Sequence, residues 1–167
     1  LERHPLARAV RIDKVSLAGL TATLLHYLRQ EAASEVPIWR MIGASEEALK
    51  ERALRWKAFL EGNLREGNMQ EENLQERNLQ EGDAVVVPGR SAIGGGSLPG
   101  ETLPSWVLSL NCRAASGGPE GVMERLRQED TPVIARIEED RVLLDPRTVL
   151  PEEDEVLLQG VRAALAR

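Results

Sequence analysis

The sequence is poor in cysteine, histidine and aromatic residues, and each shortage excludes a class of protein. Its 167 residues include one cysteine, Cys112, and two histidines. The chain therefore cannot form an internal disulfide, and it has no set of histidine and cysteine ligands for a metal. No base lies near Cys112 in the sequence to activate its thiol, so we expect a buried, unreactive strand residue.

Long apolar runs and an excess of basic residues are also missing. No run approaches the roughly 20 apolar residues of a membrane helix, and the first residues lack the pattern of a signal peptide. We therefore expect a cytoplasmic protein with no membrane partner. The net charge of −6 argues against binding nucleic acid by bulk electrostatics.

Basic residues do gather at the N-terminus, and acids are few there. The patch consists of Arg3, His4, Arg8, Arg11 and Lys14. The chain begins at Leu1, abruptly and within this patch. We therefore expect it to be part of a longer protein.

The first 60 residues show helical periodicity. Apolar residues recur at helical spacing from Asp13 to about Arg29, which predicts a helix with one buried stripe. A short helical turn is expected to begin at Pro37. Ser45 is a suitable N-cap for a second long helix that ends near Leu60, because acidic residues fill its first turn.

After residue 83 the pattern changes to strands. Buried strands are expected over residues 84–87 and 106–110, and residues 132–138 should pair with residues 141–145 across a turn. Helices are expected over residues 119–128 and from Glu152 to about Leu165. The sequence therefore predicts an α+β fold, with N-terminal helices followed by a small, mostly antiparallel sheet that carries helices on one face.

Residues 61–81 repeat with a period of five, as EGNLR, EGNMQ, EENLQ and ERNLQ. A pentapeptide β-helix needs a small residue two positions before each inward Leu, and here two of those positions hold Glu and Arg. Four coils are also few for a solenoid that depends on stacked neighbours. We favour a polar insertion, which divides the chain into a helical segment (residues 1–60), the insertion (61–82) and a small α+β domain (83–167).

A glycine-rich loop separates the first two expected strands. Gly94, Gly95 and Gly96 precede Ser97 in the run GGGSLPG. Glycines permit positive φ and let a ligand or another chain approach the backbone amides, whereas a flexible hairpin connection is the simpler interpretation.

Several segments together resemble bacterial selenocysteine synthase, the L-seryl-tRNA(Sec) selenium transferase family. They are HPLARAVRIDK at 4–14, LAGLTATL at 17–24, PIWRMI at 37–42, GGGSLP at 94–99, LPS at 103–105, PVIARI at 132–137 and LDPRTV at 144–149. The resemblance covers nearly the whole chain except the repeat. It implies the C-terminal part of a fold-type I pyridoxal 5'-phosphate enzyme that converts seryl-tRNA(Sec) with selenophosphate and forms a homo-oligomer.

The resemblance also implies roles for particular residues. It places the Schiff-base lysine and most of the cofactor site in a large domain upstream, so no catalytic residue is expected here and Lys14 is not the Schiff-base residue. Arg8 and Arg11 are expected to hold the phosphate of the selenium donor, and Arg136 is a weaker substrate-binding candidate. Gly94, Gly95, Gly96 and Ser97 are expected near the active site or a subunit interface.

Other interpretations remain open at this point. Arg147 fits a structural role beside Asp145 as well as a functional one. A non-catalytic binding or assembly module, with the repeat as its partner surface, is the alternative to a selenium transferase. A pyridoxal enzyme that acts on a small amino acid without tRNA is the third. The hypothesis of a selenium transferase part predicts an exposed apolar face where a large domain belongs.

Overall fold

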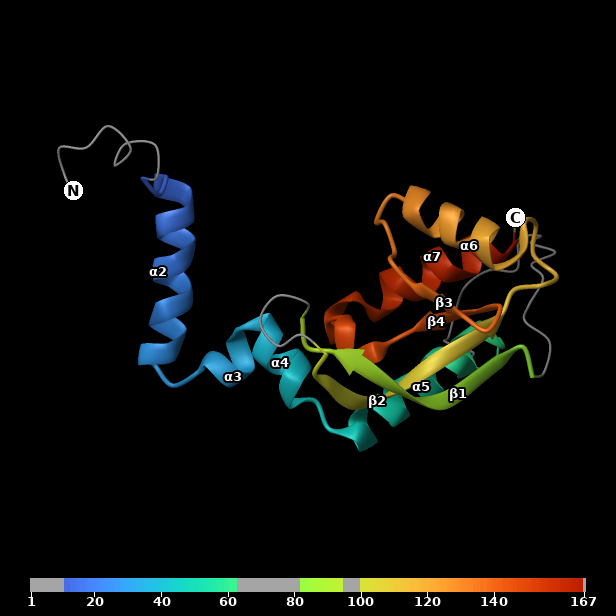
Figure 1. Cartoon of the computed structure of the whole chain (residues 1–167), viewed down its shortest axis with the longest axis horizontal. Coiled ribbons are helices and arrows are strands. Elements are labelled where there is room, and N and C mark those ends of the chain that lie inside the picture. The colour runs from blue at the N-terminus through green and yellow to red at the C-terminus, as the bar shows by residue number, and fades with distance from the viewer. Residues whose placement is uncertain (1–10, 63–81, 95–99, 167) are drawn as a thin grey trace, which may run out of the picture. The chain divides into compact units, whose positions relative to one another are not determined.

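The computed structural model describes residues 11–62, 82–94 and 100–166. By contacts along the backbone, the chain divides into two compact units, residues 1–43 and residues 44–167. Figure 1 labels the helices and strands of both units. The division of the sequence into residues 1–60, 61–82 and 83–167 concerns the domains of a larger enzyme and stays a prediction.

The first unit contains three helices among its described residues: α2 (Lys14–Leu28), α3 (Ala32–Glu35) and α4 (Pro37–Gly43). Asp13 caps α2, because its Oδ1 accepts hydrogen bonds from the backbone N–H groups of Val15 and Ser16, each at 2.9 Å. The side-chain hydrogen bond from Ser16 is the main cause that lowers the pKa of Asp13. The helix therefore begins where the sequence predicts.

The buried stripe predicted for α2 is wrong for this chain, because α2 has no buried residue. Its apolar side chains are exposed instead, and they are Val15, Leu17, Leu20, Leu24, Leu25 and Leu28. Helical spacing identifies a face that prefers an apolar environment, but it does not say which part of a protein supplies that environment. α2 thus presents an exposed apolar face, and its contact with a large domain stays a prediction.

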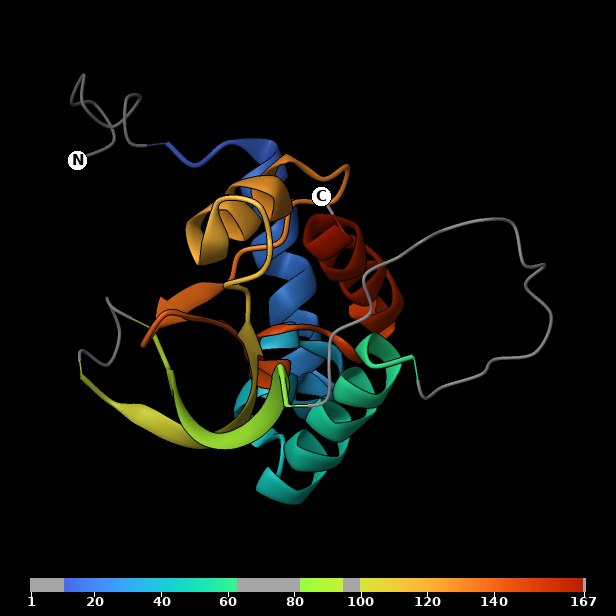
Figure 2. The same cartoon turned by 90° about the vertical axis from the view of Figure 1, so that its right-hand side faces the viewer.

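The second unit is an α+β domain, as predicted. Its elements are α5 (Glu46–Leu60), β1 (Ala84–Ala92), β2 (Thr102–Asn111), α6 (Gly118–Gln128), β3 (Arg136–Glu138), β4 (Arg141–Leu144), the 3-10 turns η1 (Pro146–Thr148) and η2 (Pro151–Glu153), and α7 (Asp154–Ala166). The strands form one antiparallel sheet in the order β1-β2-β4-β3. Figure 2 shows the sheet bent into an arc, with α5 and α7 on its outer side.

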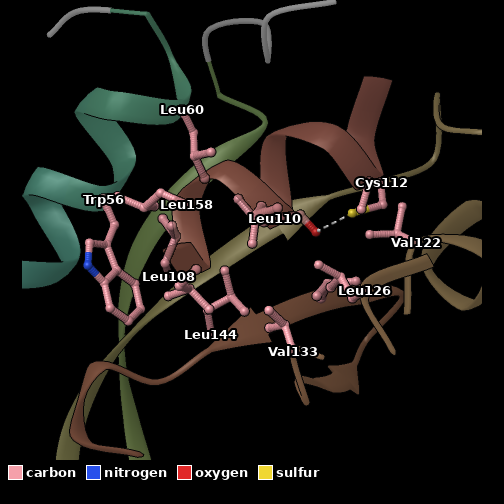
Figure 3. Packing of buried hydrophobic residues seen from close by; sticks show 14 of the residues in the cluster. Trp56, Leu60, Leu108, Leu110, Cys112, Val122, Leu126, Val133, Leu144 and Leu158 are labelled. Atoms are coloured by element: carbon pink, nitrogen blue, oxygen red, sulfur yellow. Dashed lines mark hydrogen bonds between the residues drawn. The ribbon is translucent and has the colours of Figure 1, made fainter. Parts of the chain in front are cut away.

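The core fills the space between the sheet and the helices. The sheet contributes Leu108 and Leu110 of β2, which pair in register with Leu144 and Val142 of β4. Trp56 and Leu60 of α5, Val122 and Leu126 of α6, and Leu158 and Val161 of α7 pack against them. Figure 3 shows how Leu108, Leu110 and Leu144 of the sheet face Trp56, Leu60, Leu126 and Leu158 of the helices. Because residues alternate along a strand, the neighbouring positions face the opposite side of the sheet, which the helices of this unit, α5, α6 and α7, leave uncovered (Figure 2).

The predicted elements are present with altered bounds. The strands expected over 84–87 and 106–110 are longer in the structure, whereas the hairpin partner expected over 132–138 forms a strand only at its last three residues. Cys112 is buried as expected, but it lies one residue beyond β2. The final helix is preceded by the 3-10 turn that starts at Pro151.

Candidate functional site

The N-terminal basic residues lie at the start of α2 or before it. Arg11 precedes the Asp13 cap and is exposed, and Lys14 is the exposed first residue of the helix. Arg8 lies outside the described residues. The expected pairing of Arg8 and Arg11 on one helical turn, and their role as anion ligands, stay predictions.

The glycine-rich loop joins β1 to β2. Gly94, at its start, has φ 146° and Gly100, at its end, has φ 83°, both in the region that favours glycine. Space is open around the position of a Cβ at either residue. Glycine is therefore required there by backbone conformation and not by a neighbouring group. Gly95, Gly96 and Ser97 lie outside the described residues.

Arg136 lies on the side of the sheet that the helices leave uncovered. Its Nη1 donates to the carbonyl oxygen of Arg90 at 3.3 Å, and its Nε lies 3.9 Å from an Oε2 of Glu138. These three residues border a cavity of about 450 Å³ whose other lining is apolar, namely Val87, Pro88, Gly89, Val107 and Leu143. Of the predicted substrate-binding residues that the structure describes, Arg11 and Arg136, the weaker candidate Arg136 borders one of the two cavities.

Arg147 is buried, with 6% of its surface exposed, and it connects three segments of the second unit. Its guanidinium donates to the carbonyl oxygens of Ala44 at 3.0 Å and Pro104 at 2.7 Å. Asp145 accepts from the backbone N–H of Arg147 and from the hydroxyls of Ser91 and Ser105. Of the two interpretations left open for Arg147, these contacts favour the structural one.

Arg52 is a second buried arginine, and sequence analysis did not single it out. It pairs with Asp154, and its Nη1 donates to the carbonyl oxygens of Pro146 and Val149, each at 2.8 Å. Together Arg52 and Arg147 fix the segment between β4 and α7. An arginine within the otherwise amphipathic helix α5, at a position spaced for burial, is the only signal that could have identified it.

A second cavity, of about 420 Å³, lies beside residues 131–134 and the start of α7. Its lining is mostly apolar, and the carboxylates of Asp145, Glu152 and Glu153 border it. Asp145 is occupied by the two serine hydroxyls described above. This cavity brings together none of the predicted site residues.

The lysines of the chain do not fit a Schiff-base site for pyridoxal phosphate. There are three in the whole sequence, Lys14, Lys50 and Lys57. The Nζ of Lys50 lies 4.2 Å from the centroid of the Trp106 ring, and that of Lys57 lies 3.7 Å from an Oε1 of Glu61. Neither cavity described above is lined by a lysine.

Two further classes of site find no support in the part of the chain that the structure describes. No group of three or more His, Cys, Asp or Glu side chains there could hold a metal ion. Among the same residues, no helix has both the length and the apolar character to cross a bilayer.

The described residues thus form an α+β domain and, before it in the sequence, helices that include α2 with its exposed apolar side chains. The family profile of L-seryl-tRNA selenium transferase matches residues 1–150. The chain therefore belongs to the L-seryl-tRNA selenium transferase family, as the sequence motifs predict.

Individual relatives agree over almost the full chain. A protein named L-seryl-tRNA(Sec) selenium transferase from Moorella thermoacetica is 39% identical over 163 residues, which are 97% of this chain and 31% of that protein. Proteins of the same name from Carboxydothermus hydrogenoformans and Clostridium botulinum (strain Hall) are 37% and 32% identical, over 92% and 99% of this chain. The chain spans about a third of the length of these relatives.

Proposed function

We propose that this chain is the C-terminal part of an L-seryl-tRNA(Sec) selenium transferase, which converts seryl-tRNA(Sec) to selenocysteinyl-tRNA(Sec) with selenophosphate in the cytoplasm. The observation that carries the proposal is 39% identity to a protein of that name over 97% of this chain. The same alignment leaves about two thirds of the relative unmatched, which is room for a large domain.

In this proposal the pyridoxal phosphate is bound mainly by a large domain upstream, with the lysine that carries it. The misfit of Lys14, Lys50 and Lys57 to a cofactor site supports this assignment. The exposed face of α2 supports it as well, because a helix with so many apolar side chains gains stability when another domain covers it. We expect the complete enzyme to be a homo-oligomer.

The role of this chain in the reaction is to bind an anion and to close the site. Arg8 and Arg11 would hold the phosphate of the selenium donor, since planar guanidinium groups form paired hydrogen bonds with oxyanions. Arg136 is the weaker candidate for a substrate contact. Backbone amides of residues 94–97 would approach the active site or a neighbouring subunit.

Sequencing the DNA upstream of the Leu1 codon is the first test. We expect the same reading frame to encode a domain with a lysine-bearing cofactor site. A stop codon or a start codon directly upstream would contradict the proposal and leave the non-catalytic module as the function.

The second test measures selenium transfer by the protein that this reading frame encodes. Arg11→Gln should lower the turnover of seryl-tRNA(Sec) at limiting selenophosphate by about tenfold or more, because one charge-assisted anion contact is lost. Arg113→Gln is the matched control, since its ion pair with Asp140 is exposed. Equal activity of the two variants would remove Arg11 from the site.

A further inference from the structure

The uncovered side of the sheet is curved strongly enough for its two edge strands to meet. β1 and β3 are the outermost strands in the order β1-β2-β4-β3. Nevertheless, Arg136 on β3 donates a hydrogen bond to the carbonyl oxygen of Arg90 on β1. The arc of strands in Figure 2 shows how the ends of the sheet approach each other. The inner side of this arc is the cavity of about 450 Å³.

The floor of this cavity is apolar and closely packed. Val107 and Leu143 are only 1% and 7% exposed, although α5 and α7 lie on the other side of the sheet (Figure 2). Gly89 contributes to this packing, because a Cβ at this position would lie 2.9 Å from Cγ1 of Val107. The glycine thus allows β1 to close over Val107, and the curvature leaves an apolar hollow of a size typical of small-molecule sites.

The rim of the cavity is positively charged. Two arginines, Arg90 and Arg136, and one carboxylate, Glu138, line it, although the net charge of the whole chain is −6. Arg90 is held by Thr102, which accepts from its Nε at 2.6 Å and from its Nη2 at 3.1 Å. These hydrogen bonds hold the Arg90 guanidinium at the rim. Thr102 is neutral, so they do not neutralise its positive charge.

Arg136 is held less well than Arg90. Its hydrogen bond to the Arg90 carbonyl is 3.3 Å long and its ion pair with Glu138 is 3.9 Å long. Its Nε is buried and finds no hydrogen-bond acceptor among the described residues. The Arg136 side chain as a whole is 42% exposed, so its guanidinium has donors left for an oxyanion that enters the cavity.

We propose that the inner side of the sheet binds a small molecule or substrate portion in which an oxyanion, phosphate or carboxylate, is joined to an apolar group. The oxyanion accepts hydrogen bonds from Arg136 and is attracted by Arg90, and the apolar group lies against Val87 and Pro88, the apolar lining residues that keep accessible surface. This inference rests on the substrate contact given to Arg136 in the proposed function, and it adds the chemical class of the ligand.

The test is a titration of the full 167-residue chain with three probes of similar size, followed by NMR of the backbone amides. The probes are phenyl phosphate, phenylacetate and benzyl alcohol. At least one of the two anions should bind saturably and shift the backbone amide signals of Val87, Gly89, Arg90 and Leu143. The tighter anion identifies the oxyanion. Benzyl alcohol should bind about tenfold more weakly, because it lacks the charge.

Two variants and one control locate the site. Arg136→Gln should weaken the anion by about tenfold, and Val87→Phe should abolish binding by filling the hollow. Arg113→Gln should bind as the unaltered chain does, since it removes an arginine that borders neither cavity. Should Arg136→Gln fail to fold, Arg136→Lys tests the same contact, because it keeps the charge and loses the planar donors.

Three outcomes would overturn the inference: no probe binds, benzyl alcohol binds as tightly as the anions, or the variants of Arg136 and Val87 bind unchanged. The readout is binding alone and involves no selenium transfer. Loss of transfer activity with binding intact would therefore overturn only the proposed function, and loss of binding with activity intact would overturn only this site.

Discussion

Two helices of equal length, α2 and α5, use their apolar residues in opposite ways. Each has 15 residues, a side-chain N-cap and a hydrogen-bonded C-terminal turn. α5 buries Leu49, Arg52, Ala53, Trp56 and Leu60, whereas α2 buries none. The two helices are thus alike in their local signals, and the difference lies in what packs against them.

The composition of the two helices makes this contrast informative. α5 alternates its buried residues with exposed charges and is suited to a helix that covers the sheet of its own unit. α2 has Lys14 as its only lysine, arginine, aspartate or glutamate, and it carries leucines around much of its surface. The more apolar helix is the exposed one, which supports the proposal that a further domain covers it.

The largest expected effect breaks the α5 side of this comparison. Trp56 is 1% exposed and packs in the core, so Trp56→Ala should lower the free energy of unfolding by about 3–5 kcal/mol. Urea denaturation followed by circular dichroism measures it. Leu54→Ala, in the same helix but 46% exposed, is the control and should cost less than about 1 kcal/mol. A small effect at Trp56 would contradict the packing described here.

The next effect concerns the buried arginine of α5. Arg52→Met removes the partner of Asp154 and the donors to two carbonyl oxygens, so we expect a loss of about 3 kcal/mol. Arg113→Gln, whose ion pair with Asp140 is exposed, should change stability by less than about 1 kcal/mol. Equal losses in the same denaturation experiment would show that burial does not distinguish the two pairs.

Much of the fold could be predicted because local signals determine it. Asp13 caps α2 and Ser45 caps α5, each from the position before the first helical residue, and acidic residues fill the first turn of α5. The strands around the glycine-rich loop follow from their β-branched and apolar residues. The strand predicted from Pro132 is mostly absent, because Val133 donates its N–H to the carbonyl oxygen of Leu126 at the end of α6 instead of to a strand.

The candidate site was less predictable, because it depends on contacts between distant residues. Arg136 and Arg90 are 46 positions apart and meet only through the curvature of the sheet. No motif in the sequence connects them. Arg147 stood beside Asp145 in the sequence, but its partners Ala44 and Pro104 come from other segments. Sequence spacing can identify an arginine as a candidate. The tertiary structure is needed to distinguish an arginine that stabilises the fold from one that is accessible to a ligand.

The ionisation of Cys112 reports on how well the core beside the sheet excludes water. Burial is the main cause that raises the pKa of its thiol from 9.0 to about 11. In the unfolded chain the thiol ionises above about pH 9, whereas in the folded chain it stays protonated until about pH 11. Stability should therefore fall as the pH rises through this window, relative to Cys112→Ala.

Denaturation at pH 8 and pH 10 measures this loss, which we expect to be on the order of 1 kcal/mol. A thiol reagent at pH 8 gives an independent check, and Cys112 should react much more slowly in the folded chain than in urea. Rapid reaction in the folded chain would place Cys112 at an accessible position.

The smallest effect on this chain is expected on α2, where the comparison is sharpest. Leu17→Ser and Leu24→Ser replace side chains that are 49% and 52% exposed. Because little apolar area is buried there, the pair should change the stability of the 167-residue chain by less than about 1 kcal/mol. In a longer protein whose further domain covers α2, the same pair should lower the melting temperature and weaken assembly. Leu60→Ser, on the buried face of α5, should destabilise both proteins alike. Equal tolerance of the α2 pair in both proteins would mean that no further domain covers this helix.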